Sequence, residues 1–340
     1  MTQPNKISKH LTQSTDPLII DGAMGTYLEL LGADVSGSLW SASMLVSEPN
    51  LIKRTHVDYF RAGANIVITA SYQASLPGLV KHLNLSEAEA ANVVRKSVEL
   101  AMAARDEYIK GILEGEELGG RRGDSEAEIK SEEALRKKLF VAGSVGPYGA
   151  FLADGSEYRG DYVVGKEEMK AFHRGRVQAL VAAGVHVLAC ETIPSKRETE
   201  ALLELLTHEF KDTEAWFTFT LRDDGHISDG TPLADIASLF EGVDQVVGIG
   251  FNCVPDDVAL AALKKLKPLA KSATLVVYPN SGEQWNAKTR EWEGTKTEEG
   301  STLAHKTVEW VSAGARLIGG CCRTTPEDIR TMSEALQGDQ

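Results

Sequence analysis

Short apolar runs alternate with longer segments of helical period along most of the chain. Each apolar run is followed by a segment whose apolar residues recur at the spacing of a helix. The runs are apolar throughout rather than alternating, which is typical of parallel strands covered on both faces. The eight predicted strands are residues 17–21, 64–70, 139–144, 185–191, 215–221, 246–253, 273–279 and 315–319. The predicted helices are residues 49–62, 86–109, 166–183, 195–209, 232–240, 256–270, 301–312 and 326–336.

Regular alternation of strands and helices over this length predicts an α/β fold, a (β/α)8 TIM barrel in a single domain. A doubly wound open sheet is the main alternative. The polar residues 1–16 predict a flexible N-terminal tail, and the barrel domain then takes residues 17–340. One segment, residues 111–138, is rich in Glu, Lys, Arg and Gly and lacks an apolar period. We expect it to be a charged, solvated insertion before the third strand.

Composition excludes several classes of protein. The net charge of −13 and the lack of a basic stripe argue against a nucleic-acid partner. No apolar run reaches membrane-spanning length, and the first residues do not resemble a secretory signal. The four cysteines have no regular spacing, so a disulfide framework is not expected. These features predict a protein of the reducing cytoplasm with free thiols.

The carboxyl ends of the strands form the active-site face of a barrel, so the residues there are the first candidates for chemistry. The fold prediction brings three thiols and two carboxylates to this one face, although they are scattered along the chain. The polar residues at strand ends are Asp21, Thr69, Ser144, Glu191, Asn252, Cys253, Asn280, Cys321 and Cys322.

Cys253, Cys321 and Cys322 follow two different strands and form a candidate metal site. Thiolates are soft ligands that select zinc over magnesium or calcium. Three protein ligands with one open position are typical of catalytic zinc. We expect Gly319 and Gly320 to turn the strand so that the adjacent cysteines reach one ion. The alternative is three buried, inert cysteines.

Two residues of the fourth strand are expected to be structural. Cys190 alternates with Glu191, so it should pack under the helices if Glu191 faces the site. His186 lies in mid-strand without a metal-binding spacing, and we expect it to pack as well.

A zinc ion held by three thiolates suits one kind of reaction. Such a centre is a poor Lewis acid for a carbonyl, but it deprotonates a bound thiol and leaves the sulfur nucleophilic. The implied reaction is attack by a substrate thiolate on the methyl group of a cationic donor. Asp21 and Glu191 then bind a substrate ammonium group, and the alternative is a pair of acid and base for glycoside hydrolysis. The tyrosines between 148 and 162 and Trp285 can bind an onium cation or simply pack.

The motifs Gly250-Phe-Asn-Cys253 and Gly319-Gly-Cys-Cys322 resemble the homocysteine-binding domain of the zinc-dependent homocysteine S-methyltransferases. The resemblance runs from about residue 18 to residue 336. It includes four more motifs in the expected order, which start at Asp21, Thr69, Cys190 and Tyr278.

The resemblance implies a role for each candidate site residue. The zinc ligands are Cys253, Cys321 and Cys322, and the amino group of homocysteine contacts Asp21 and Glu191. The backbone at Gly22 and Ala23, with Thr69 nearby, holds the homocysteine carboxylate. Asn252 shapes the site beside the metal. Gln73 stands where betaine-using relatives have a tyrosine, and we count it among the substrate-binding residues.

The segment from 145 to 162 indicates the methyl donor. It resembles the short plant, yeast and bacterial enzymes, which use S-methylmethionine and, less well, S-adenosylmethionine. We expect no methyl-folate donor, because the chain has no room for folate and cobalamin modules. The predicted activity is therefore a homocysteine S-methyltransferase that gives methionine. The alternatives are a betaine- or selenocysteine-using methyltransferase, a non-catalytic zinc-binding protein, and a hydrolase with buried cysteines.

Overall fold

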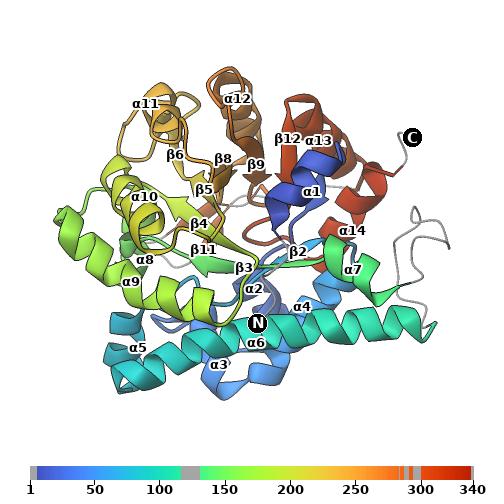
Figure 1. Cartoon of the computed structure of the whole chain (residues 1–340), viewed down its shortest axis with the longest axis horizontal. Coiled ribbons are helices and arrows are strands. Elements are labelled where there is room, and N and C mark those ends of the chain that lie inside the picture. The colour runs from blue at the N-terminus through green and yellow to red at the C-terminus, as the bar shows by residue number, and fades with distance from the viewer. Residues whose placement is uncertain (1–5, 116–130, 283, 287–290, 294–299, 338–340) are drawn as a thin grey trace.

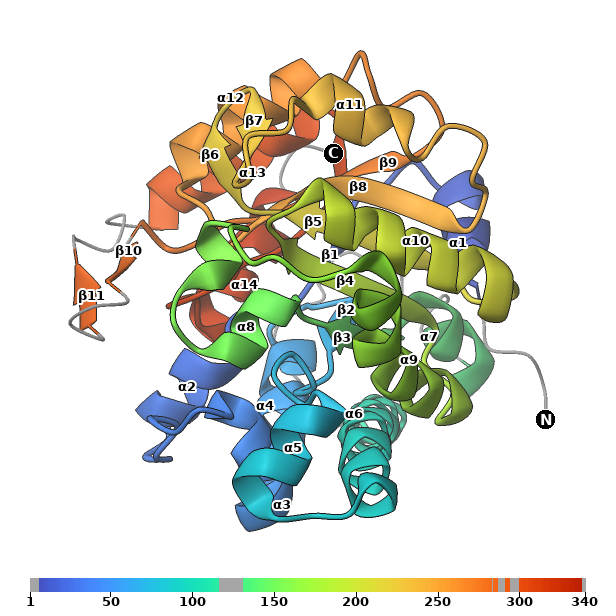
Figure 2. The same cartoon turned by 90° about the vertical axis from the view of Figure 1, so that its left-hand side faces the viewer.

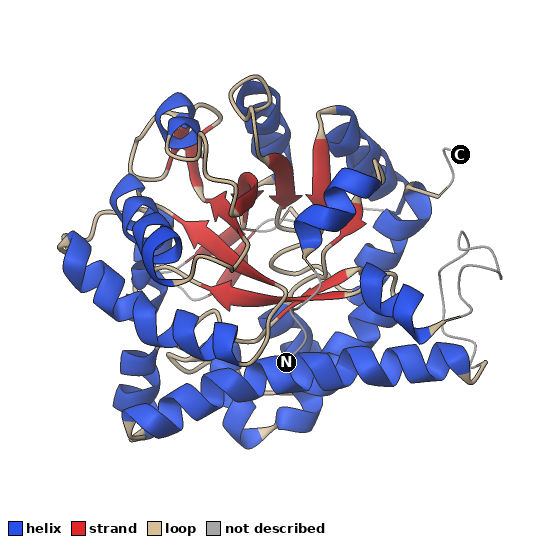
Figure 3. Ribbon diagram, viewed as in Figure 1, coloured by secondary structure: helices blue, strands red, loops and turns tan. Residues whose placement is uncertain are grey.

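Eight parallel strands form a barrel, as predicted (Figures 1 and 3). The computed structural model describes residues 6–115, 131–282, 284–286, 291–293 and 300–337. The strands are β1 (Leu18–Ile19), β2 (Ile66–Ile68), β3 (Phe140–Val145), β4 (Val187–Ile193), β5 (Ala215–Phe219), β8 (Val246–Asn252), β9 (Thr274–Tyr278) and β12 (Ala315–Ile318). From β2 to β12 each strand pairs with the next in this series, and β12 pairs with β1. A parallel bridge between Ile20 and Ile66 joins β1 to β2, so the sheet closes rather than staying open.

Helices surround the barrel as predicted (Figure 3). Ser86 and Glu89 form a capping box at the start of α6. The helices that follow strands are α4 (Pro49–Arg61), α6 (Glu87–Leu113), α9 (Lys166–Ala182), α10 (Lys196–Glu209), α11 (Leu233–Ser238), α12 (Asp256–Leu266), α13 (Gly300–Ser312) and α14 (Pro326–Ala335). The hydrophobic pattern of the chain did not predict the short elements α2 (Met24–Leu30), η1 (Trp40–Ser43), α3 (Met44–Ser47), α5 (Leu76–Leu83), α8 (Tyr148–Leu152), η2 (Ser156–Tyr158), β6 (Leu221–Asp223), β7 (His226–Ile227), β10 (Gln284–Asn286) and β11 (Glu291–Glu293). Most are only one or two turns long, too short for periodicity to reveal.

Alternation along the strands divides the apolar core into two layers. Phe140 and Trp216 face the inside of the barrel, whereas Phe217 packs between the strands and the helices. Cys190 is fully buried in this outer layer, as predicted. His186 is also buried, and its Nδ1 accepts a hydrogen bond from the Val141 N–H at 3.0 Å. Burial lowers the pKa of His186 to about 4, so the ring is neutral and structural.

The predicted N-terminal tail contains a helix, α1 (Ile7–Gln13), which lies against the amino ends of the strands. Ile7 is fully buried in the inner apolar layer. The Ser8 N–H donates to the Glu214 carboxylate at 3.2 Å, and Arg316 Nη1 donates to the Leu11 carbonyl at 2.9 Å. Tertiary contacts of this kind stabilise a two-turn helix that its own polar sequence does not predict.

The charged segment 111–138 is more ordered at both ends than predicted. Helix α6 continues to Leu113, and Gly115 has the positive φ of 77° that is typical after a helix end. Helix α7 (Glu132–Lys138) begins at a Ser131 cap and buries Leu135. Residues 116–130 lie outside the described residues. Among the described helices, none is long and apolar enough to span a membrane.

Candidate active site

A cavity of about 140 Å³ opens at the carboxyl ends of the strands. The structure brings all ten predicted site residues to this one cavity. They are Asp21, Gly22, Ala23, Thr69, Gln73, Glu191, Asn252, Cys253, Cys321 and Cys322. The hydrolase alternative required thiols buried away from the site, and the three sulfur-bearing residues line the cavity instead.

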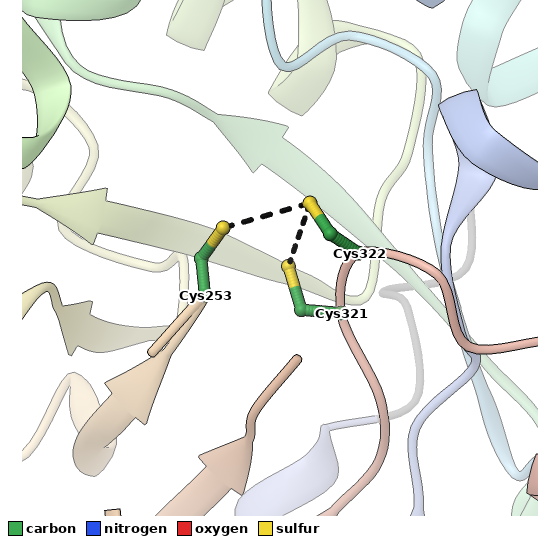
Figure 4. Close-up of side chains that lie close together, drawn as sticks. All are labelled: Cys253, Cys321 and Cys322. Atoms are coloured by element: carbon green, nitrogen blue, oxygen red, sulfur yellow. Dashed lines mark hydrogen bonds between the residues drawn. The ribbon is translucent and has the colours of Figure 1, made fainter. Parts of the chain in front are cut away.

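Three thiols form a compact triangle in the cavity (Figure 4). The Cys253 and Cys322 Sγ atoms are 3.6 Å apart, and those of Cys321 and Cys322 are 4.0 Å apart. All three sulfur atoms lie within 4.8 Å of one another. A tetrahedral ion about 2.3 Å from each sulfur needs sulfur–sulfur separations of about 3.8 Å. The triangle therefore has the dimensions of a three-thiolate metal site.

Left-handed backbone positions aim these cysteines. Cys253 has a φ of 55°, and its N–H donates to the Tyr278 carbonyl at 3.2 Å. Arg323, directly after Cys322, has a φ of 66°. Non-glycine residues adopt this region at a cost, and such positions gather at functional sites. Thr192 and Trp40 also line the cavity with positive φ values of 61° and 44°.

The predicted role of the two glycines as the turn is wrong. Neither Gly319 nor Gly320 has a positive φ, and the left-handed turn lies at Arg323. The glycines are needed for space instead. A Cβ at Gly319 would lie 2.8 Å from the Ile20 Cβ, and one at Gly320 would lie 2.4 Å from the Thr324 Oγ1. The strand end can therefore pass close to β1 and to the following turn.

The crowding of the thiols favours a shared negative charge. Hydrogen bonds from Cys321 and Cys322 lower the pKa of the Cys253 thiol, and the same contact with Cys253 raises the pKa of Cys322. The Tyr158 hydroxyl lies 3.2 Å from the Cys253 Sγ. Three thiols of this kind, one buried and two half-buried, around one anion are well suited to a cation.

Asp21 and Glu191 carry buried carboxylates, with 3% and 7% of their surfaces exposed. The Asp21 Oδ2 accepts a hydrogen bond from the Ile68 N–H at 2.9 Å. Glu191 accepts hydrogen bonds from the Ser144 hydroxyl and, at 3.1 Å, from the Tyr278 hydroxyl. Burial raises the pKa of both groups, that of Glu191 to about 7. Two desolvated carboxyl groups on one cavity favour a cationic substrate group.

Asn252 is fixed by two hydrogen bonds to Thr192. Its Oδ1 accepts from the Thr192 N–H at 2.8 Å, and its Nδ2 donates to the Thr192 hydroxyl at 2.8 Å. The same Nδ2 lies 4.0 Å from the Cys321 Sγ. Asn252 therefore lies beside the thiols, where the resemblance placed it.

The predicted carboxylate-binding backbone is only partly available. The Ala23 N–H donates to the Thr324 carbonyl and hydroxyl, both at 3.2 Å, so this amide is already engaged. The Thr69 hydroxyl accepts from the Ser144 N–H at 3.0 Å. The Gln73 Nε2 lies 3.4 Å from the Ala150 carbonyl, which orients its amide along the cavity wall.

Several residues that line the cavity were not predicted as site residues, although Tyr158 is one of the tyrosines that were candidates for an onium contact. Glu157 and Tyr158 come from η2, in the long loop after β3, rather than from a strand end. The tyrosine-rich composition of residues 148–162 was the only signal for this loop. Trp40 and Tyr72 also line the cavity. The side chain of Trp285, a predicted onium contact, lies outside the described residues.

Comparisons with known proteins show the family of the chain. The family model "Homocysteine S-methyltransferase" matches residues 18–336. The Escherichia coli homocysteine S-methyltransferase is 48% identical, over 98% of this chain and 99% of the relative. The selenocysteine methyltransferase of Astragalus bisulcatus is 39% identical, over 98% of this chain and 96% of the relative. The crystal structure of the E. coli homocysteine methyltransferase MmuM in its metallated form superposes with a TM-score of 0.80 at 47% identity, covering 98% of this chain and 99% of that one. The chain is therefore an enzyme, a methyltransferase, and it belongs to the homocysteine S-methyltransferase family.

Proposed function

We propose that this enzyme transfers a methyl group from a sulfonium donor, foremost S-methylmethionine, to the sulfur of homocysteine and so forms methionine. S-adenosylmethionine is the second donor. The observation that carries the proposal is the composition of the cavity wall. Three thiols and three carboxylates line it, and none of its described residues is Lys, Arg or His. The negative charge of such a wall attracts an onium donor. Its three thiols can hold a metal ion, and this ion can bind the thiol of the acceptor.

We propose that Cys253, Cys321 and Cys322 hold zinc. The soft donor set favours zinc, and three ligands leave a fourth position for a substrate thiol. The spacing of the Sγ atoms fits such an ion, and the E. coli relative has a structure described as metallated. A zinc ion bound there lowers the pKa of an acceptor thiol while leaving its sulfur nucleophilic.

The chain's own carboxylates orient the acceptor in this proposal. The ammonium group of homocysteine binds Asp21 and Glu191, and its positive charge lowers their raised pKa values again. Ser144 and Tyr278 hold Glu191 in place for this contact. Asn252 and Thr69 shape the wall beside the acceptor, and Gln73 and the backbone of Gly22 complete the substrate contacts.

The reaction balances without a further reagent. The thiol of homocysteine gives its proton to solvent, and its sulfur attacks the donor's methyl carbon. The bond between that carbon and the donor sulfur breaks, and the electron pair stays on the donor sulfur. A cationic sulfonium thus becomes a neutral thioether. With S-methylmethionine as donor, both products are methionine.

The test is a direct assay. Purified, zinc-loaded protein is incubated with homocysteine and S-methylmethionine, and methionine is measured over time. Donor arms with S-adenosylmethionine and betaine rank the donors. Absence of turnover with every sulfonium and betaine donor would sink the proposal. Turnover with betaine alone would replace the donor class and leave the acceptor site standing.

Selenocysteine is a second acceptor candidate, because one relative carries that name. The same zinc site would take a selenolate in place of a thiolate. Competition between homocysteine and selenocysteine in one assay, read by mass spectrometry of both methylated products, decides which acceptor has the higher kcat/KM.

We also propose a single homocysteine-binding domain over residues 17–340, working in the cytoplasm. All four cysteines are free, and three of them must stay reduced to bind a metal. Oxidation of the purified protein should release the metal, and a thiol reductant should restore binding.

A further inference from the structure

We propose that Glu157 binds the positive sulfur of the methyl donor. This inference rests on the proposed sulfonium chemistry and adds the residue that recognises the donor's charge. It concerns a carboxylate that lies apart from the strand ends. Glu157 belongs to η2 (Ser156–Tyr158) and lines the same cavity as the thiols.

The position of Glu157 is fixed by its backbone. Its carbonyl accepts a hydrogen bond from the Thr220 hydroxyl at 3.0 Å. Helix α8 packs so closely that a Cβ at Gly149 would lie 2.5 Å from the Glu157 nitrogen. The next residue, Tyr158, places its hydroxyl 3.2 Å from the Cys253 Sγ. The η2 turn therefore lies directly beside the thiols, where a donor methyl group has to arrive.

One oxygen atom of the Glu157 carboxylate has no hydrogen-bond partner. Its Oε2 is shielded from solvent and makes no hydrogen bond. Arg159, two residues away, forms its ion pairs with Asp161 at 3.0 Å and Asp154 at 3.7 Å, and it acts on Glu157 only through its charge. Buried polar atoms without partners are rare, so the Oε2 calls for an explanation, and a bound cationic ligand would supply its partner. Burial also raises the pKa of Glu157 to about 7, as expected for a carboxylate that awaits a positive charge.

Glu157 suits the donor better than the acceptor. Asp21 and Glu191 already supply two carboxylates for the single ammonium group of homocysteine, and both are set in the strand ends with hydrogen bonds of their own. S-methylmethionine brings two further positive charges, its own ammonium group and its sulfonium, and of these only the sulfonium has to lie next to the acceptor sulfur. Its reacting methyl group must point at the acceptor sulfur, so its positive sulfur must lie on the line of attack, one C–S bond beyond the methyl carbon. A carboxylate on the turn next to the thiols is placed to meet it.

The charge of the donor disappears in the reaction, and this gives Glu157 a role in turnover. The carboxylate attracts the donor while its sulfur is positive and has no such attraction for the neutral thioether that remains. It thus separates S-methylmethionine from methionine, which differ by one methyl group and one charge. The enzyme can therefore bind its donor tightly and still release the neutral thioether product.

Glu157→Gln tests this inference. We expect the KM for S-methylmethionine to rise about 10–100-fold, the range for loss of one buried charged contact. The KM for homocysteine and the zinc content should stay unchanged. The matched control is Asp161→Asn, which removes the same charge from an exposed position in the same loop and should leave the donor KM unchanged. An unchanged donor KM in Glu157→Gln, or an equal rise for both substrates, would overturn the inference.

Binding of an uncharged analogue gives a second readout. Wild-type enzyme should bind S-methylmethionine more tightly than the carbon isostere in which CH replaces the positive sulfur, and in Glu157→Gln this ratio should shrink about 10-fold or more. If that variant does not fold, Glu157→Asp is measured in the same way and should show an intermediate ratio. An undiminished ratio overturns the inference. A wild-type enzyme that uses no sulfonium at all would refute the proposed function itself, which is a different result.

Discussion

The two ends of the barrel are built from the same strands but in opposite ways. At the carboxyl ends lie the thiols, the buried carboxylates and the left-handed residues Thr192 and Cys253. At the amino ends, α1 covers the inner apolar layer with Ile7, and Arg316 and Glu214 bond to the helix. Figure 2 shows α1 on one side of the barrel and α2 and α8 on the other.

The carboxyl ends of the strands thus carry the residues for chemistry, and the amino ends carry contacts that stabilise the fold. At the carboxyl ends of the strands, the mouth of the barrel, the Gln73 Oε1 and the Glu157 Oε2 are buried without a hydrogen-bond partner, which costs stability and prepares the site for cationic ligands. At the amino ends of the strands, the base of the barrel, Glu214 and Arg316 form hydrogen bonds with α1 and Ile7 is buried, as expected for the end of a barrel that carries no chemistry. A substitution at the mouth should therefore change binding or turnover, and one at the base should change the free energy of unfolding.

The largest effect is expected at the metal site. Cys322→Ser removes one of three proposed ligands, so metal and activity should be lost together, with kcat/KM falling by more than the roughly 10–100-fold that loss of an outer partner costs. Metal analysis after dialysis and the methionine assay measure both. Cys190→Ala, which removes the thiol of the outer layer, should keep its metal. Full metal content and full rate in Cys322→Ser would rule out this site.

An intermediate effect is expected at the base. Ile7→Ala leaves a cavity in the inner layer and should lower the free energy of unfolding by about 2–4 kcal/mol, with kcat and both KM values unchanged at 25 °C. Denaturant titration measures the loss. Val163→Ala removes methyl groups from a side chain that is 89% exposed and should have little effect. A changed KM in folded Ile7→Ala would show that the two ends are not separate.

The smallest effect is expected in the pH dependence of the free energy of unfolding, through Glu191 at the mouth. Folding raises the pKa of Glu191 from 4.5 to about 7 and so favours its protonated form. Its contribution to stability is present below pH 4.5 and is lost as pH rises through about 7. Metal-free Glu191→Gln should therefore gain about 1–3 kcal/mol over the wild-type protein between pH 5 and pH 8. Chemical denaturation at the two pH values measures this gain. A difference that stays constant with pH would show that Glu191 ionises as freely in the folded chain as in the unfolded one.

Much of the barrel follows from the sequence, because its strands are buried on both faces and read as continuous apolar runs. The same logic placed Asp21, Glu191 and Cys253 at one mouth, since the carboxyl ends of parallel strands meet there. Alternation along β4 also separated Glu191 from Cys190 correctly. The positions of these residues follow from their place at the end of an apolar run and from the alternation of side chains along a strand, and both can be read from the sequence.

The features that escaped prediction depend on contacts between distant segments. Helix α1 has a polar sequence and is held by Glu214 and Arg316 from far along the chain. Glu157 lies on a single short turn, where no period exists to be recognised. The turn of the cysteine pair was assigned to the glycines, whereas packing against Ile20 and Thr324 decides their identity. Steric crowding of this kind is invisible until the fold is known.

The pairing of β1 with β12 has a consequence for synthesis on the ribosome. Leu18 in β1 can pair with Leu317 in β12 only after residue 317 has been translated. Until then β1 and β9 are open edges, and such edges pair readily with other chains. Cys321 and Cys322 follow β12, so the nascent chain carries Cys253 without these two thiols while residues 254–320 are made. Closure of the barrel and completion of the thiol triangle thus both wait for residues 315–322.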